Sequence, residues 1–399
     1  MSQAGAGIKR KRIPEIDFWR GFALVVILVD HVPWNGLDYL NPRNFGFSDA
    51  AEAFVFLSGV SVSLAYAPTL QKAGFWRLIN RCANRAAKLY LVQIAMVACS
   101  IAIPLAAAKL VGDEGIVLGQ GLSQFVNSPV SSLIGVVTLA YQPNYSCVLA
   151  LYVVLMLWAP VVIFLASRSP ASALLASIAV YMAGRGRVGG DLGGGWYFNP
   201  FAWQLVFAIG IICALRWRNG LPRPQGRLVV LALAIILGAA VLSIRAMGLR
   251  AAALAHLDLD KHDLGVVRLG HFLALAYVMS AVAIVQPWAT HTSRIVGSRM
   301  GQSFQGMGRN SLLFFALGSI ASAGGRSLMA MAHSLAVPHL SVHLIGLVYT
   351  AVVVIGIFAV TNRMHRTAGS PELSTENGIA PAAPMNSLRT EADESAALP

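Results

Sequence analysis

Residues 145–166 read YSCVLALYVVLMLWAPVVIFLA, a run of 22 residues without a charged side chain. About 20 such residues, wound into a helix, cross the roughly 30 Å hydrocarbon core of a membrane. A soluble core can contain one run of this kind, but this chain repeats the pattern nine more times. The other apolar stretches lie at 15–34, 50–68, 86–108, 171–185, 200–216, 227–247, 268–287, 311–332 and 341–361.

These ten stretches predict an all-α membrane protein, a bundle of about ten transmembrane helices. The stretch 171–185 fits the pattern least well. Residues 128–140 form an eleventh apolar stretch that is too short to cross, and we expect it to lie at the interface or to re-enter the membrane.

The composition agrees with a chain that faces lipid. It is 56% hydrophobic and 12% charged, with a mean hydropathy of +0.65, whereas a soluble domain carries about 25% charged residues. The net charge of +13 does not indicate nucleic-acid binding, because the basic residues sit between apolar stretches. Neither the four cysteines nor the nine histidines have the spacing of a metal site, so we expect none.

The distribution of Lys and Arg predicts the orientation. With ten spans and the N-terminus inside, 20 of these residues fall on inner segments and nine on outer segments. The positive-inside rule then places both termini in the cytoplasm of a plasma membrane. We therefore expect a basic cytoplasmic segment at 1–14, a transmembrane domain at 15–362 and a disordered cytoplasmic tail at 363–399.

The first span, DFWRGFALVVILVDHVPWN (17–35), holds ionisable residues that a lipid-facing helix would avoid. Arg20 and His31 are about three turns apart, so they share one helix face and are separated by about 16 Å. Asp17 lies on that face and can pair with Arg20. His31 suits general-base catalysis, although a histidine at the outer interface can equally serve as a simple hydrogen-bond partner.

The segment after the first span contains three further candidates. Ser48 can cap a helix whose first turn holds Asp49 and Glu52, which is a structural explanation for both acids. In the functional interpretation, Glu52 enters the membrane beside His31 and steadies its charged form. Asn44 is a candidate donor to an oxyanion.

A basic run follows the second span. Arg77, Arg81, Arg85 and Lys88 fall close to one helix face, where like charges repel. Such a run usually anchors the chain to anionic lipid. The alternative is a cytoplasmic site for the phosphates of a nucleotide-type donor.

Two polar clusters are predicted on the outer side. The segment WYFNPFAWQ (196–204) brings Trp196, Asn199 and Gln204 to the interface, as an aromatic belt or as a sugar-binding rim. The segment DLDKHDLGVVRLGH (258–271) forms the second cluster. We expect a glycan acceptor to be bound by residues of both clusters together with Asp49, and the second cluster contributes Lys261, Arg268 and His271.

Together these segments resemble the OpgC-type membrane proteins, which succinylate osmoregulated periplasmic glucans and are related to the acyltransferase-3 class. The resemblance runs from about residue 13 to 315. It is strongest in RIPEIDFWRGFALVVILVDHVPWN (12–35) and NPRNFGFSDAAEAFVFLSG (41–59). The chain departs from the family pattern in PNYSCVLALYVV. From the family pattern we would expect an acidic residue near Cys147 and a proline near Ala150, and this chain has neither residue at those two positions.

The resemblance implies an acyltransferase-3-like bundle, a catalytic His31 and an acyl-CoA donor, succinyl-CoA by family. The donor phosphates would be held by the run from Arg77 to Lys88, and no permanently bound cofactor is implied. We expect direct transfer to a glycan hydroxyl, since Ser48, Ser58 and Cys147 lack a nucleophile motif. A glycan or lipid-carrier transporter and a non-catalytic subunit of a glucan assembly complex remain as alternatives.

Overall fold

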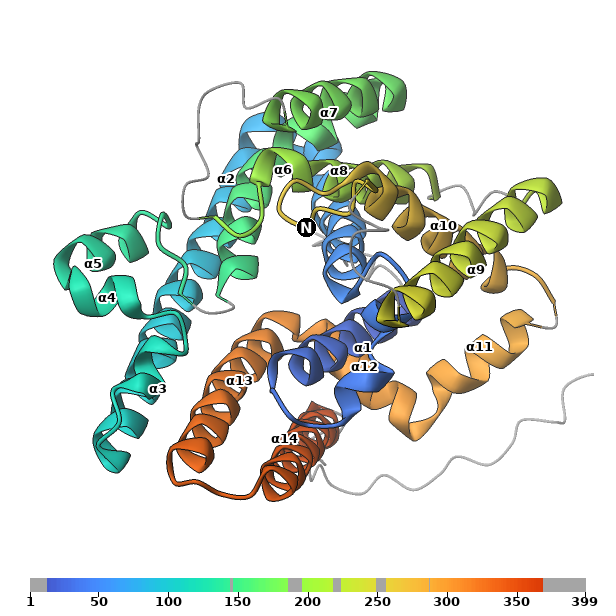
Figure 1. Ribbon diagram of the computed structural model, residues 1–399. Helices are drawn as coiled ribbons and strands as arrows, with labels where there is room; N and C mark the ends of the chain where they lie inside the picture. The colour runs from blue at the N-terminus through green and yellow to red at the C-terminus, as the bar shows by residue number, and fades with distance from the viewer. Residues whose placement is uncertain are drawn as a thin grey trace, which may run out of the picture.

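The computed structural model describes residues 13–143, 146–185, 196–217, 224–248, 256–286 and 288–368. Every regular element in these ranges is a helix, as the apolar stretches predict (Figure 1). The helices are α1 Pro14–His31, η1 Leu37–Leu40, η2 Pro42–Phe45, α2 Ala50–Val111, α3 Gly115–Leu118, α4 Ser123–Asn127, α5 Pro129–Val137, α6 Cys147–Arg168, α7 Pro170–Arg185, α8 Pro200–Arg216, α9 Gly226–Gly248, α10 Val266–Val282, α11 Trp288–Gly297, α12 Arg299–Arg309, α13 Ser311–Ser334 and α14 His339–Ala368.

Helices cover most of each of the ten predicted stretches. Among the described residues, five helices are long and apolar enough to cross a membrane, namely α2, α6, α9, α13 and α14. Helices α8 and α10 are apolar but shorter. The structure is therefore that of a helical membrane protein, while ten crossings remain a prediction.

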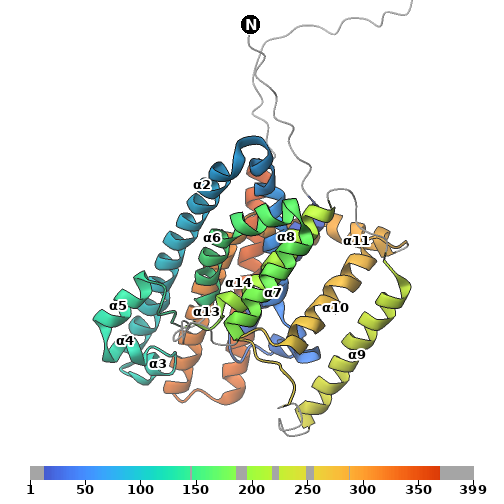
Figure 2. The same ribbon diagram turned by 90° about the horizontal axis from the view of Figure 1, so that it is seen from above.

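The two predicted spans 50–68 and 86–108 both belong to α2, which is interrupted at Gly74. This glycine has φ 79° and ψ 177°, a backbone conformation that is essentially restricted to glycine. The helix turns back at this point (Figure 2), and Arg81 donates a hydrogen bond across the turn to Thr69. The two halves of α2 therefore act as separate helices.

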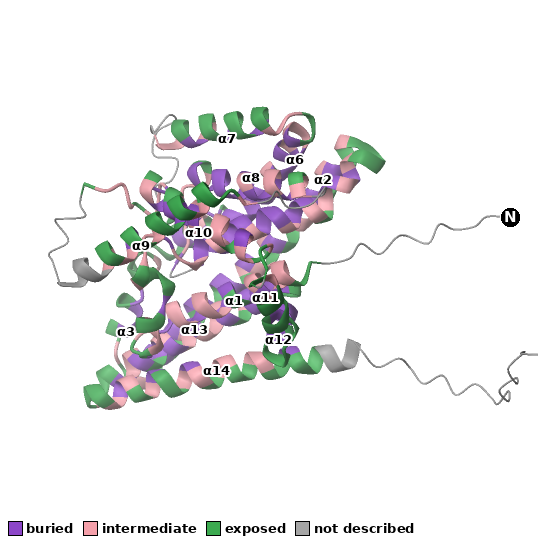
Figure 3. Ribbon diagram, turned by 90° about the vertical axis from the view of Figure 1, so that its right-hand side faces the viewer, coloured by how far each residue is buried: buried purple, intermediate pink, exposed green. Residues whose placement is uncertain are grey.

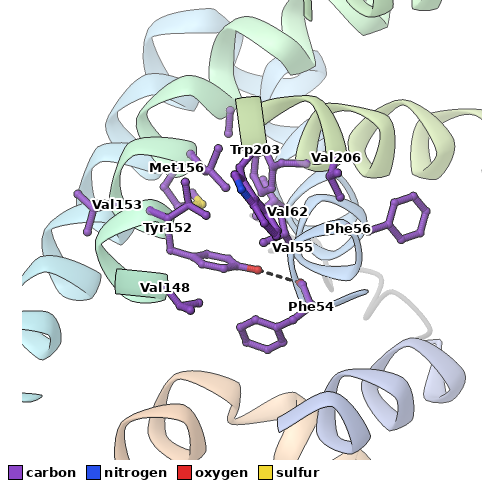
Figure 4. Close-up of a cluster of buried hydrophobic side chains, with 14 of the residues drawn as sticks. Phe54, Val55, Phe56, Val62, Val148, Tyr152, Val153, Met156, Trp203 and Val206 are labelled. Carbon is purple, nitrogen blue, oxygen red and sulfur yellow. Dashed lines mark hydrogen bonds between the residues drawn. The ribbon is translucent and has the colours of Figure 1, made fainter. Parts of the chain in front are cut away.

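Two glycines let α2 and α8 touch through their backbones. A Cβ atom on Gly59 would lie 2.1 Å from the carbonyl oxygen of Phe207, and one on Gly210 would lie 2.3 Å from that of Phe56. Around this contact the core is closed by fully buried Trp203. Figure 4 shows the core beside it, where the Tyr152 hydroxyl donates to the carbonyl oxygen of Phe54 at 2.9 Å.

Helix α1 lies between the group formed by α2, α6, α7 and α8 and the pair α13 and α14 (Figure 1). It packs against α12, where Cβ atoms on Gly21 and Gly308 would overlap the backbones of Phe304 and Asp17. The outer faces of α9 and α14 remain exposed and apolar (Figure 3), including Leu237 and Ile355, at 66% exposed each. Lipid is the solvent that suits these faces.

Several predicted boundaries are tested by these helices. The predicted tail at 363–399 begins too early, because α14 continues to Ala368. Residues 369–399 and 1–12 lie outside the described residues. The short stretch 128–140 forms α5, of nine residues, too short to cross.

Candidate active site

Arg20 lies where three helices meet. Its guanidinium donates to the hydroxyl of Ser311 on α13 at 2.5 Å and to that of Ser61 on α2 at 3.3 Å. Its Nε is buried and has no hydrogen-bond partner among the described residues. Asp17, the predicted partner of Arg20, also forms an ion pair with Arg309 at 3.5 Å.

A cavity of about 230 Å³ opens beside Arg20. Both halves of α2 line it, Tyr66 from the first half and Arg85 from the second, and Tyr152 of α6 lies opposite. Its two cationic side chains were thus predicted from separate parts of the sequence, Arg20 within the first span and Arg85 in the basic run. The cavity combines these cations with hydroxyl groups, as an anionic ligand requires.

A second, smaller cavity of about 20 Å³ is lined by His31. Val148 and Phe315 line both cavities, so they form a wall between the two. The two cavities therefore follow one another, the first beside Arg85 and Arg20 and the second beside His31, on the side of α1 that faces the protein interior. This arrangement agrees with the shared helix face predicted for Arg20 and His31.

The backbone sets the tautomer of His31. Its Nδ1 lies 2.5 Å from the carbonyl oxygen of Ile27. A carbonyl oxygen can only accept, so Nδ1 of the neutral ring carries the proton and Nε2 keeps the lone pair. This is the arrangement of a general base.

The end of α1 is fixed by its neighbours. Buried Asn35 donates to the carbonyl oxygens of Val29, at 2.7 Å, and Val32. Asp30, next to His31 in sequence, is held 2.5 Å from Arg43. Asp30 is thereby committed to the loop rather than to the imidazole.

The predicted phosphate cluster is only partly drawn together. Arg85 lines the Arg20 cavity, and Arg81 packs over the ring of Tyr66, which also lines it, at 5.2 Å. Arg77 and Lys88 are exposed and line neither cavity. The structure thus divides the run into two residues near the cavity and two that face outward.

Asp49 and Glu52 form a capping box at the start of α2 and bind two cations from the other end of the chain. Asp49 Oδ2 lies 2.6 Å from Lys261 Nζ and 2.8 Å from Arg268. Fully buried Glu52 pairs with Arg268 and accepts from the backbone N–H of Asp49. Glu52 therefore belongs to this ion cluster, contrary to the expectation that it steadies His31.

The ion cluster shifts two pKa values outside the spans. Burial alone would raise the pKa of Asp49, but neighbouring Lys261 and Arg268 lower it well below its usual value. Burial alone would lower the pKa of Lys261, but Asp49 raises it. His271 lies nearby, with Nδ1 2.8 Å from Ser48 Oγ, and its buried Nε2 has no hydrogen-bond partner in the described part of the chain.

The predicted sugar rim is largely structural. Asn199 caps α8 and donates to Asp263 at 2.9 Å. Gln204 is buried and donates to the carbonyl oxygen of Ser177 at 2.7 Å, so its placement on the rim is wrong. Trp196 is half-buried against the core. Asn44 donates to the carbonyl oxygen of Asp38 and lines neither cavity, so the structure does not bring this expected oxyanion donor to His31.

The sequence interpretation missed Arg326, which lines the His31 cavity from α13. Its NH1 lies 3.5 Å from the carbonyl oxygen of His31. A detectable signal existed, because Arg326 is the one Lys, Arg, Asp or Glu in the apolar stretch 311–332. The rule that drew attention to Arg20 applies equally to this residue.

Comparison with known proteins gives one match. A family model described as OpgC protein matches residues 12–362. No curated protein and no solved structure matches the chain. Since the matched residues cover most of the sequence, including both cavities, the chain belongs to the OpgC family.

Proposed function

We propose that this chain is a membrane-bound O-acyltransferase of the inner membrane. It would move an acyl group, succinyl by family, from cytoplasmic acyl-CoA to hydroxyls of a periplasmic or extracellular glycan. The observation that carries the proposal is the pair of adjoining cavities, one beside Arg85 and Arg20 and the other beside His31. A donor with phosphates at one end and a thioester at the other fits this order of charges.

In this reaction Arg85 and Arg81 hold donor phosphates, which guanidinium groups bind through charge-assisted hydrogen bonds. Arg20 lies further along the path. The flexible arm of the donor extends past Val148 and Phe315, whose side chains move apart to admit it. The thioester then reaches His31.

His31 acts on the acceptor. Nε2 takes the proton from a sugar hydroxyl as its oxygen attacks the thioester carbonyl carbon. A C–O bond forms, the C–S bond breaks, and the proton passes from the imidazolium to the departing thiolate. The products are a glycan ester and free CoA thiol.

The test is acyl substitution of periplasmic glycans, measured by mass spectrometry in a deletion strain. We expect the wild-type chain to restore the acyl mass and His31→Ala to lower its formation by about 10²- to 10⁴-fold, the usual contribution of a general base. His256→Ala, at an exposed histidine, is the matched control and should behave as wild type. All three are compared at equal membrane abundance.

Two outcomes would contradict the proposal. Equal restoration by wild type and His31→Ala would exclude His31 as the base and favour a non-catalytic subunit. A wild-type chain that changes no glycan mass would favour a transporter, for which the same charges would line a substrate path.

A further inference from the structure

Arg326 is the one Lys or Arg among the described residues that line the His31 cavity. It sits within α13, one of the candidate membrane spans. A charged side chain there is costly unless it faces the protein interior or a polar cavity. Arg326 meets this condition, because it lines the His31 cavity and is partly buried.

The remaining lining of the His31 cavity is apolar or hydroxylated, and no Asp or Glu is among the lining residues. Two of its serines use their hydroxyl hydrogens elsewhere: Ser146 donates to the carbonyl oxygen of Pro143 at 2.6 Å, and Ser322 to that of Gly318 at 2.8 Å. These two serines can offer only lone pairs to a ligand. Arg326 therefore supplies the positive charge and the strongest donors in this cavity.

We infer that Arg326 selects the acyl group by binding a carboxylate at its far end. This inference rests on the proposed acyltransferase function. In a short dicarboxylic acyl group, two methylene groups separate the free carboxylate from the thioester, so the carboxylate can bind Arg326 while the thioester lies beside His31. The cavity of about 20 Å³ has room for about one water molecule, so it must widen as the donor arm enters past Val148 and Phe315. A guanidinium matches a carboxylate with two parallel hydrogen bonds, whereas an acetyl group has no carboxylate to form them.

A different role for Arg326 would be to stabilise the oxyanion formed from the thioester carbonyl. That role would assist every acyl donor equally, because each passes through the same oxyanion. Selection of the far carboxylate instead affects only donors that carry it. Donor comparison therefore separates the two roles.

The first experiment uses the purified full chain in lipid nanodiscs, with glycan isolated from the deletion strain as acceptor. Succinyl-CoA is compared with succinamoyl-CoA, in which an uncharged amide replaces the carboxylate at nearly constant size. We expect kcat/KM to be about 10- to 100-fold higher for the charged donor, the range for hydrogen bonds to a charged group. Equal values for the two donors would overturn the inference while leaving the proposed function intact.

The second experiment assigns the preference to Arg326. Arg326→Gln should bring the ratio of kcat/KM for succinyl-CoA to that for succinamoyl-CoA close to one, whereas Arg326→Lys should retain part of the preference. A wild-type melting temperature shows that each variant is folded. An unchanged ratio in a folded Arg326→Gln variant, which includes an equal loss for both donors, would overturn the assignment. A wild-type chain that transfers no acyl group from any donor would overturn the proposed function, and this inference with it.

Discussion

Asp49 binds two cations that arrive from more than 200 residues away, Lys261 and Arg268. Its side chain is 10% exposed, so removing its charge takes away the ion-pair partner of Lys261 and leaves Arg268 with Glu52 alone. We expect Asp49→Asn to lower the free energy of unfolding by about 3–5 kcal/mol, as for other broken buried pairs. Thermal melting in detergent measures the change, with Asp38→Asn as a control at an exposed pair, where about 0–1 kcal/mol is expected.

The same contacts predict how stability depends on pH. Because the folded pKa of Asp49 is lowered from 3.8, its contribution is present above pH 3.8 and is lost as the pH falls toward its folded value. Because the folded pKa of Lys261 is raised from 10.5, its contribution is present below pH 10.5 and is lost as the pH rises through its folded value. The difference in melting temperature between wild type and Asp49→Asn should therefore persist at neutral pH and shrink below pH 3.8. A difference that stayed constant down to pH 2 would contradict this account.

Helix α2 depends on one glycine for its change of direction. A Cβ atom on Gly74 would meet nothing within 4 Å, so the obstacle to substitution is the backbone conformation alone. We expect Gly74→Ala to destabilise the fold by about 1–3 kcal/mol and to weaken donor binding, since both halves of α2 line the Arg20 cavity. Gly238→Ala on α9, which also has open space around it, should leave donor binding unchanged. Unchanged melting and donor affinity in Gly74→Ala would show that the turn tolerates an L-residue.

The helices themselves could be predicted because apolar composition over about 20 residues is a local property. The turn at Gly74 was predicted only as a gap between two spans, since a positive φ is not visible in composition. Helices α11 and α12 were missed because their mean hydropathy is that of a loop. Helix α12 reads RMGQSFQGMGR and buries only part of its surface.

The site was harder to predict because its contacts join distant parts of the chain. The shared face of Arg20 and His31 follows from helix periodicity. The partner of Glu52 does not, because Arg268 lies 216 residues away and no periodicity relates the two. The sequence interpretation therefore assigned Glu52 to His31, which precedes it by one loop, and did not single out Arg326.

For the whole molecule, the orientation can be tested by labelling. Tyr39 and Trp76 are 76% and 77% exposed, on opposite sides in the predicted topology. We expect a membrane-impermeant maleimide to label Tyr39→Cys in spheroplasts and Trp76→Cys only after permeabilisation. The background carries Cys99→Ala and Cys213→Ala, since those two cysteines are partly exposed. The reverse pattern would invert the topology and place the basic run outside.

The wall formed by Val148 and Phe315 affects whether protons can cross the membrane through this protein. A continuous file of water between Arg20 and His31 would let protons leak down the electrochemical gradient whenever no donor was bound. Both side chains are apolar and more than 90% buried, and a hydrophobic constriction interrupts such a file by excluding water. If the proposed reaction takes its donor from one side and its acceptor from the other, this apolar wall keeps the membrane closed to protons between turnovers.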